Sequence, residues 1–305
     1  MGDHLGMGTL CFPDAVKSCF ACCPPIRPAG YEHATHQLIV RRILRENAGS
    51  FVKGDRSIIP IRGFSCWALG YLDGDCRTVG CLLHPHQNHG VDMRYRVDYG
   101  GKCQRETCPE AKTFETLSPR VKRFWMPLAD GLDSFSYSDR SSNLLFRMMN
   151  WGASLLGLIC SAEAEEGFAG EAFLKAYPFF RTSLLPRGHA YLLGRLVNET
   201  NLDWLKSVRF RDAFEEFSSD LTACRSGMPL SLSGAGKSGN HEGRPRPHVH
   251  LLPLDRHWSD FLRLTLRVTR ASLEVALAIK EEVDARIERF RKENLQPLNR
   301  HGAQP

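Results

Sequence analysis

The spacing of hydrophobic residues predicts that residues 116–305 form an all-helical region. One long helix is expected over about residues 256–294 and another near residues 200–221, because apolar residues recur there every three or four positions. The stripe of the long helix consists of Ala276, Ile279, Val283, Ile287 and Phe290, and that of the other helix of Phe210, Phe214, Phe217 and Leu221. Such stripes are typical of helices that pack around a shared core.

Other segments of this region fit the same prediction. Ser118 and Pro119 are typical of the cap and the first residue of a helix. The apolar run of residues 143–160 predicts one buried helix. It is about as long as a membrane is thick, but Arg147 and Asn150 interrupt it, so we expect no membrane span. Residues 225–248 are rich in Gly, Ser and Pro and predict a flexible loop.

The first part, residues 1–115, is rich in turn-forming residues and predicts a small irregular module. One helix is expected in "ATHQLIVRRILREN", with Leu38, Ile39 and Ile43 on its inner face, and one or two short strands in "IIPIRGFSCWALGYL". A module with so many loops buries little apolar surface, and a bound metal can supply the missing stability. The predicted fold class is therefore mainly α, with a cysteine-rich metal-binding module before an all-helical domain.

Charge and composition narrow the function classes. The 305 residues carry a net charge of +6, from 40 basic and 34 acidic residues spread along the chain. Nucleic-acid binding is not expected, since no basic stripe interleaved with aromatic residues is present. The first residues lack the pattern of a secretory signal, which predicts a cytoplasmic protein. Eleven cysteines in that compartment indicate metal binding or thiol chemistry rather than disulfides.

Nine of the cysteines fall within the first 108 residues, and their spacing predicts metal ligation. Cys19 and Cys22 form a C-x-x-C pair, which supplies two thiolates from one turn. Wider C-x4-C pairs follow, namely Cys76 with Cys81 and Cys103 with Cys108. One tetrahedral zinc needs only about four thiolates. The set therefore predicts more than one site, a cluster plus a zinc, or some cysteines that do not bind. Cys160 and Cys224 are expected to be ordinary packing residues.

The segments "CFACC", "CWALGYLDGDC", "CLLHP" and "GKCQRETCP" together resemble the YkgJ-type cysteine-cluster family, a zinc- or iron-chelating domain, and within it an uncharacterised bacterial subgroup. The resemblance covers about residues 11–115. It implies a ligand set of Cys19, Cys22, Cys23, Cys66, Cys76, Cys81, Cys103 and Cys108. Where the family has a further cysteine this chain has Val16, so either Cys11 replaces it from a longer loop or the site has one thiolate fewer.

Two classes of function follow from the resemblance. In the first, an iron–sulfur cluster or zinc folds a module with a structural role or one that binds a protein partner. In the second, the protein is a metal-dependent enzyme. The flagellin lysine-N-methylases resemble this family in their cysteine cluster, which implies a methylase using S-adenosylmethionine, and redox chemistry at a cluster is a further alternative. No glycine-rich cofactor loop is present, and "GAGKSG" has Ser231 where a phosphate loop needs glycine.

Histidines offer weaker candidates for the metal site. His84, His86 and His89 follow Cys81, and an imidazole can complete a zinc site beside thiolates. His84 fills a family position for which a structural role is expected. A second group, His248, His250 and His257, is interpreted as part of an exposed loop that leads into the last helix.

Overall fold

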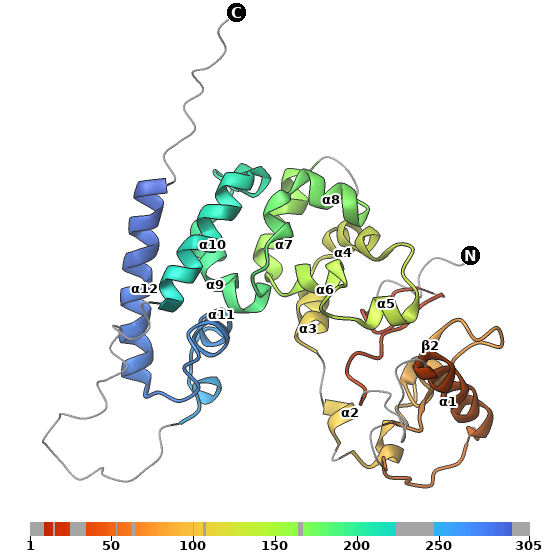
Figure 1. The fold of residues 1–305 in the computed structure, drawn as a ribbon. Coiled ribbons are helices and arrows are strands. Elements are labelled where there is room, and N and C mark those ends of the chain that lie inside the picture. Colours follow the sequence, from red (N-terminus) through yellow and green to blue (C-terminus); the bar gives the residue numbers. More distant parts are fainter. Residues whose placement is uncertain are drawn as a thin grey trace, which may run out of the picture. The chain divides into compact units, whose positions relative to one another are not determined.

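The computed structural model describes residues 9–14, 16–24, 35–52, 54–62, 65–99, 101–105, 108–163, 167–223 and 247–294. Figure 1 shows a mainly helical chain with one small hairpin, which confirms the prediction of a mainly α fold. The helices are α1 His36–Ser50, α2 Lys102–Arg105, α3 Pro109–Thr116, α4 Pro119–Trp125, α5 Ser134–Ser138, α6 Leu144–Met149, α7 Ala153–Ala162, α8 Gly170–Ala176, α9 Pro186–Leu196, α10 Val208–Ala223, α11 Arg256–Asp260 and α12 Leu273–Asn294; the strands are β1 Leu69–Tyr71 and β2 Val79–Cys81.

The chain divides into two compact units. The first contains residues 1–153 and 163–170, and the second contains residues 154–162 and 171–305. The change of composition near residue 115 falls inside the first unit, because helices α3 to α6 belong with the cysteine-rich segments. Residues 224–246 and 295–305, which include most of the predicted flexible loop, lie outside the described residues.

A small core in the first unit lies between α1 and the antiparallel hairpin of β1 and β2. Gly70 and Gly80 face each other across the hairpin. A side chain at Gly70 would place its Cβ 3.2 Å from the backbone nitrogen of Ala48 and 3.3 Å from the carbonyl oxygen of Leu44. A side chain at this position would therefore push α1 slightly away from the strand, whereas glycine lets the two pack closely.

The structure corrects the predicted inner face of α1. Val40 and Leu44 are the buried residues, whereas Leu38 is 70% exposed and Ile39 and Ile43 are only partly buried. The periodicity predicted the helix but not this face, because a two-stranded hairpin covers a narrower strip of the helix than a full sheet would.

Residues 9–24, described except for residue 15, fasten the hairpin to α5. The Ser134 hydroxyl accepts hydrogen bonds from the backbone N–H of Ser18 at 3.3 Å and from that of Val79, in β2, at 3.1 Å. The Ser138 hydroxyl accepts another from the N–H of Phe20 at 3.0 Å. The N-terminal segment, the hairpin and a helix distant in sequence therefore form one unit.

Sequence signals in the helical part of the first unit are only partly confirmed. Ser118 caps α4 as predicted, because its hydroxyl accepts from the N–H of Val121 at 3.4 Å. The apolar run of residues 143–160, however, forms two helices rather than one. Helix α6 ends at Met149 and α7 begins at Ala153, since Gly152 takes a left-handed conformation with φ 98° that turns the chain out of the helix.

Helix α9 is the central element of the second unit. Helices α11 and α12 and a π-helical turn, Phe261–Thr265, all pack against it. The single helix predicted over residues 256–294 is therefore wrong, because the π-helical turn and the segment that follows it separate α11 from α12. The predicted stripe of α12 is confirmed, since all five of its residues are buried.

Helix α10 packs largely as predicted. Phe210, Phe214 and Leu221 are buried, while Phe217 stacks on Phe290 of α12 with ring centroids 4.5 Å apart. Among the described residues, no helix combines the length and apolar character needed to cross a membrane.

Candidate metal centre

The nine N-terminal cysteines lie on separate segments of the first unit. They are Cys11, Cys19, Cys22 and Cys23 in residues 9–24, Cys66, Cys76 and Cys81 in and beside the hairpin, Cys103 in α2, and Cys108 at the start of α3. All of them are free thiols, as is Cys160, which is buried in α7. Cys224 lies outside the described residues.

Cys22 lies close to most of the other thiols. The negative charge of a Cys22 thiolate raises the pKa of six other cysteines, which come from every cysteine-bearing segment except α3. They are Cys11, Cys19, Cys23, Cys66, Cys81 and Cys103. The charge of Cys108 acts on Cys19 in turn. The fold thus gathers eight thiols from sequence-distant segments into one region.

Cys76 occupies a different place. It lies in the connection between β1 and β2, with a left-handed φ of 55°, and its charge acts on Tyr71. Cys81, by contrast, pairs with Leu69 at the other end of the hairpin. Thr78, the last residue of the connection, comes three residues before Cys81. At about 3.3 Å per residue along the strand, Cys81 therefore lies roughly 10 Å from the end of the hairpin that carries Cys76.

Burial and backbone hydrogen bonds act on these thiols in opposite directions. Burial raises the pKa of Cys19, and raises those of Cys66 and Cys81 to about 11 and about 12. Each thiol also receives a backbone hydrogen bond from the residue two positions further on, which lowers its pKa: Ala21 for Cys19, Ala68 for Cys66 and Leu83 for Cys81. Backbone donors of this kind stabilise a thiolate and orient it as a ligand.

Cys108 has the same type of contact at a helix start. Its sulfur accepts from the N–H of Ala111 at 3.4 Å and so caps α3. Burial raises the pKa of Cys108 to about 12.

Cys22 and Cys23 share a hydrogen bond between their thiols. This bond lowers the pKa of Cys22 to about 6, whereas the same bond, together with burial, raises the pKa of Cys23. The proton of the pair is therefore held more strongly by Cys23 than by Cys22.

The described side chains do not yet converge on a common point. No group of three or more His, Cys, Asp or Glu side chains in the described ranges has an arrangement that would hold a metal ion as it stands. Metal binding would therefore require the thiols to turn inward, as happens where binding and folding are coupled.

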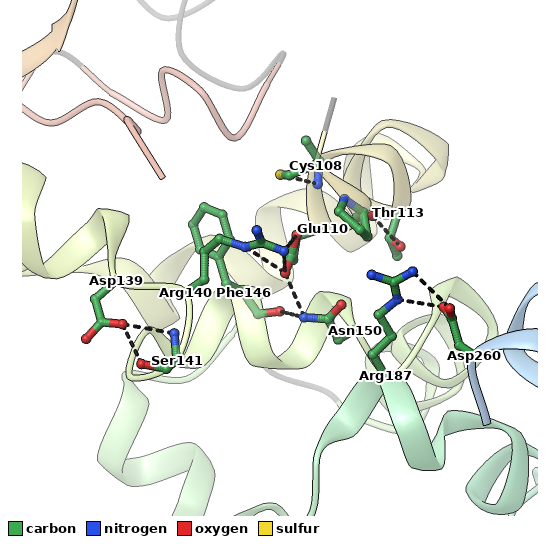
Figure 2. Close-up of polar contacts among 12 residues, drawn as sticks. Cys108, Glu110, Thr113, Asp139, Arg140, Ser141, Phe146, Asn150, Arg187 and Asp260 are labelled. Atoms are coloured by element: carbon green, nitrogen blue, oxygen red, sulfur yellow. Dashed lines mark hydrogen bonds and ion pairs between the residues drawn. The ribbon is translucent and has the colours of Figure 1, made fainter. Parts of the chain in front are cut away.

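A buried carboxylate network lies next to the thiols (Figure 2). Glu110 is 2% exposed. Nη2 of Arg140 donates to both of its carboxylate oxygens, at 2.7 and 2.8 Å, and the side-chain amide of Asn150 donates to one of them at 2.9 Å. Burial alone would raise the pKa of Glu110, but these bonds outweigh it and lower the pKa. The Arg140 charge also acts on Cys22 and Cys108.

Arg94 is a second cation beside the thiols. It binds Asp92 with two parallel hydrogen bonds, 2.9 Å from Nε and 2.7 Å from Nη2. Its charge acts on Cys11, Cys22 and Cys103. Sequence reasoning did not single out either arginine, since a lone Arg forms no motif.

The histidine candidates lie in two separate places. His84 and His86 both lie against Phe12, with ring centroids 4.8 Å from it. Nδ1 of His84 accepts from the backbone N–H of His86 at 3.3 Å, and burial lowers the pKa of His84 to about 4, so its ring is neutral at pH 7. In the second unit the ring centroids of His248 and His250 are 5.3 Å apart. Nε2 of His248 lies 3.0 Å from Nη2 of Arg270.

A third ion pair was also not predicted from the sequence. In the second unit Arg187 of α9 binds Asp260 of α11 through two hydrogen bonds, of 2.6 and 2.9 Å, and Asp260 is 3% exposed (Figure 2). Because it joins two packed helices, it has a structural explanation.

Comparison with known proteins adds no relative: the chain matches no family model, no curated protein and no solved structure.

Proposed function

We propose that the first unit is a metal-binding module in which cysteine thiolates hold zinc or an iron–sulfur cluster. The observation that carries this proposal is that free thiols from four segments of the chain act electrostatically on one another: Cys22 acts on six others, and Cys108 acts on Cys19. Ordinary packing cysteines have no reason to collect in this way, whereas soft thiolate ligands for zinc or iron must do so.

The surroundings of the thiols support the same proposal. Backbone donors at Cys19, Cys66, Cys81 and Cys108 favour the thiolate form that a metal requires. Arg94 and Arg140 offset the negative charge that several thiolates would bring together. Free thiols in such number also fit a reducing compartment, so we propose a cytoplasmic location.

The role we propose for the metal is structural. The hairpin core of the first unit is small, and metal–thiolate bonds would tie its loops together and present a surface to a protein partner. Calorimetric titration with S-adenosylmethionine distinguishes this role from the methylase alternative, because a methylase would bind that cofactor.

The first test is metal analysis with an absorption spectrum on protein purified without oxygen. Iron with inorganic sulfide and a broad visible band would identify a cluster, and zinc without colour would identify a zinc centre. Cys66→Ser is expected to lose metal. Cys160→Ser is the matched control, because Cys160 is a buried thiol of the second unit. Protein that holds no metal, even after reconstitution with zinc or with iron and sulfide, would contradict the proposal.

A further inference from the structure

Residues 57–62 run in extended form along the surface of the first unit. The backbone N–H of Ile59 donates to the carbonyl of Arg96 at 2.7 Å, and that of Ile61 donates to the carbonyl of Val97 at 3.2 Å. Backbone donors two positions apart that point the same way are typical of a strand. We call this segment the extended edge.

Side chains also hold the inner side of the extended edge. Arg96, which is 2% exposed, donates through Nε to the Ser57 carbonyl at 3.2 Å and pairs through Nη2 with Asp55 at 3.1 Å. Its Cζ lies 5.3 Å from the ring centroid of Trp67, and Nε1 of Trp67 donates to the Ile59 carbonyl at 2.7 Å. The odd-numbered residues of the extended edge therefore turn their backbone groups towards the protein.

The even-numbered residues, Ile58, Pro60 and Arg62, turn their backbone groups to the outside. Within the part of the chain that the structure describes, these groups form no hydrogen bond. Ile58 is 59% exposed and Ile59 42%. A free backbone edge that carries exposed apolar side chains can pair with a strand from another molecule. Since Pro60 has no N–H, Ile58 and Arg62 supply the donors.

Positive charge flanks the apolar part of the extended edge. Arg56 and Arg62 are exposed, and neither forms an ion pair with another described residue. Asp55, the one acidic residue of 54–62, is already paired with Arg96. A second copy of this chain would add its own two arginines to such an interface, whereas an acidic partner would neutralise them.

A cleft of about 300 Å³ lies at the Arg56 end of the extended edge. Arg56 and His89 line it together with the apolar residues Val91, Met93 and Tyr95, and no acidic residue is among the described residues around it. Its lining therefore suits an apolar side chain that has an acidic neighbour.

We propose that the extended edge binds a strand of a partner protein in which apolar residues are flanked by acidic ones. The partner's backbone pairs with that of Ile58 and Arg62, and its carboxylates lie beside Arg56 and Arg62. One of its apolar side chains occupies the cleft. The inference rests on the proposed structural function, for which it names the chemistry of the partner.

The test is selection from a displayed library of short random peptides on the full chain purified without oxygen. We expect the enriched peptides to combine β-branched or aromatic residues with Asp or Glu on either side. Enrichment of basic peptides, or of none, would overturn the proposal.

Variants then locate the binding of an enriched peptide. Ile58→Pro removes an outward N–H and no hydrogen bond of the described chain, and Arg62→Glu reverses one flanking charge. Each should weaken binding by about tenfold. Arg62→Glu should also bind more tightly than wild type to the same peptide with Lys in place of its acidic residues. Arg209→Glu, an equal charge change at an exposed position of the second unit, is the matched control. Unchanged affinity in Ile58→Pro and Arg62→Glu would contradict binding at this edge.

Hydrogen exchange on the unchanged chain avoids the folding of the variants. The amides of Ile58 and Arg62 should exchange more slowly in the complex, whereas those of Ile59 and Ile61, already bonded inward, should change little. A complex without slower exchange at Ile58 would overturn strand pairing.

Two further outcomes separate this proposal from its neighbours. A dimer that Ile58→Pro abolishes would make a second copy the occupant of the edge and overturn the acidic partner. A chain that holds metal but selects no peptide would contradict the partner alone, while one that selects acidic peptides but holds no metal would contradict the metal-binding function alone.

Discussion

At the scale of single residues, the ion pair between Arg140 and the buried Glu110 should stabilise the fold. Arg140→Gln would leave a carboxylate that is 2% exposed with a weaker partner. We expect the free energy of unfolding to fall by about 2–3 kcal/mol, somewhat less than for a fully buried pair because Arg140 is 39% exposed. Urea unfolding measures this. Arg77→Gln is the control, because its pair with Asp75 is exposed on both sides and should change stability by less than about 1 kcal/mol. Equal losses would contradict the argument.

Asp139 predicts a specific dependence of stability on pH. Hydrogen bonds from Ser141, drawn in Figure 2, and from Ser142 lower its pKa from 3.8 to about 2. Its contribution to stability is therefore present above about pH 4 and is lost as the pH falls towards 2. In Asp139→Asn this contribution is missing at every pH. The difference in unfolding free energy between wild type and variant should shrink on acidification across that range. Urea titrations at several pH values measure it, and a constant difference would show that the carboxylate does not titrate as described.

At the scale of elements, two glycines of α9 should behave in opposite ways. A Cβ at Gly188 would lie 2.9 Å from Oγ1 of Thr265, in the π-helical turn, whereas a Cβ at Gly194 would meet no atom within 4 Å. Gly188→Ala should therefore destabilise by about 1–3 kcal/mol through overpacking. Gly194→Ala should stabilise by up to about 1 kcal/mol through helix propensity. Thermal unfolding compares them, and a shift of the same sign in both would argue against close packing of α9 on the turn.

The elements that the sequence predicted are those defined by local signals. Ser118 caps a helix through its own hydroxyl, and the stripe of α12 follows from periodicity alone. The interruptions were missed because tertiary contacts set them, as at the π-helical turn packed on α9, or because one glycine adopts a positive φ, as at Gly152. In the candidate site, spacing identified the cysteines as a set. It could not separate Cys76 from Cys81, because only the hairpin register places them at opposite ends.

At the scale of the whole molecule, the proposed metal should protect only one of the two units. Removing it with a chelator, or substituting Cys66, is expected to open the first unit to limited proteolysis, because metal binding and folding are coupled in small thiolate-bound modules. The second unit has its own apolar core around α9, α10 and α12 and should survive as a resistant fragment. Mass spectrometry of the digest identifies the fragments. Equal resistance of the first unit with and without metal would contradict the structural role.

The hydrogen bond between Tyr137 and Leu10, which joins residues 127 positions apart, bears on how the protein is made. A growing chain presents its first cysteines to the cell long before α5, to which they are fastened, has left the ribosome. During that interval Cys11, Cys19, Cys22 and Cys23 lack their final surroundings. Contacts of such long range also form slowly. The supply of reductant during synthesis should therefore affect the yield of the metal-bound form that we propose.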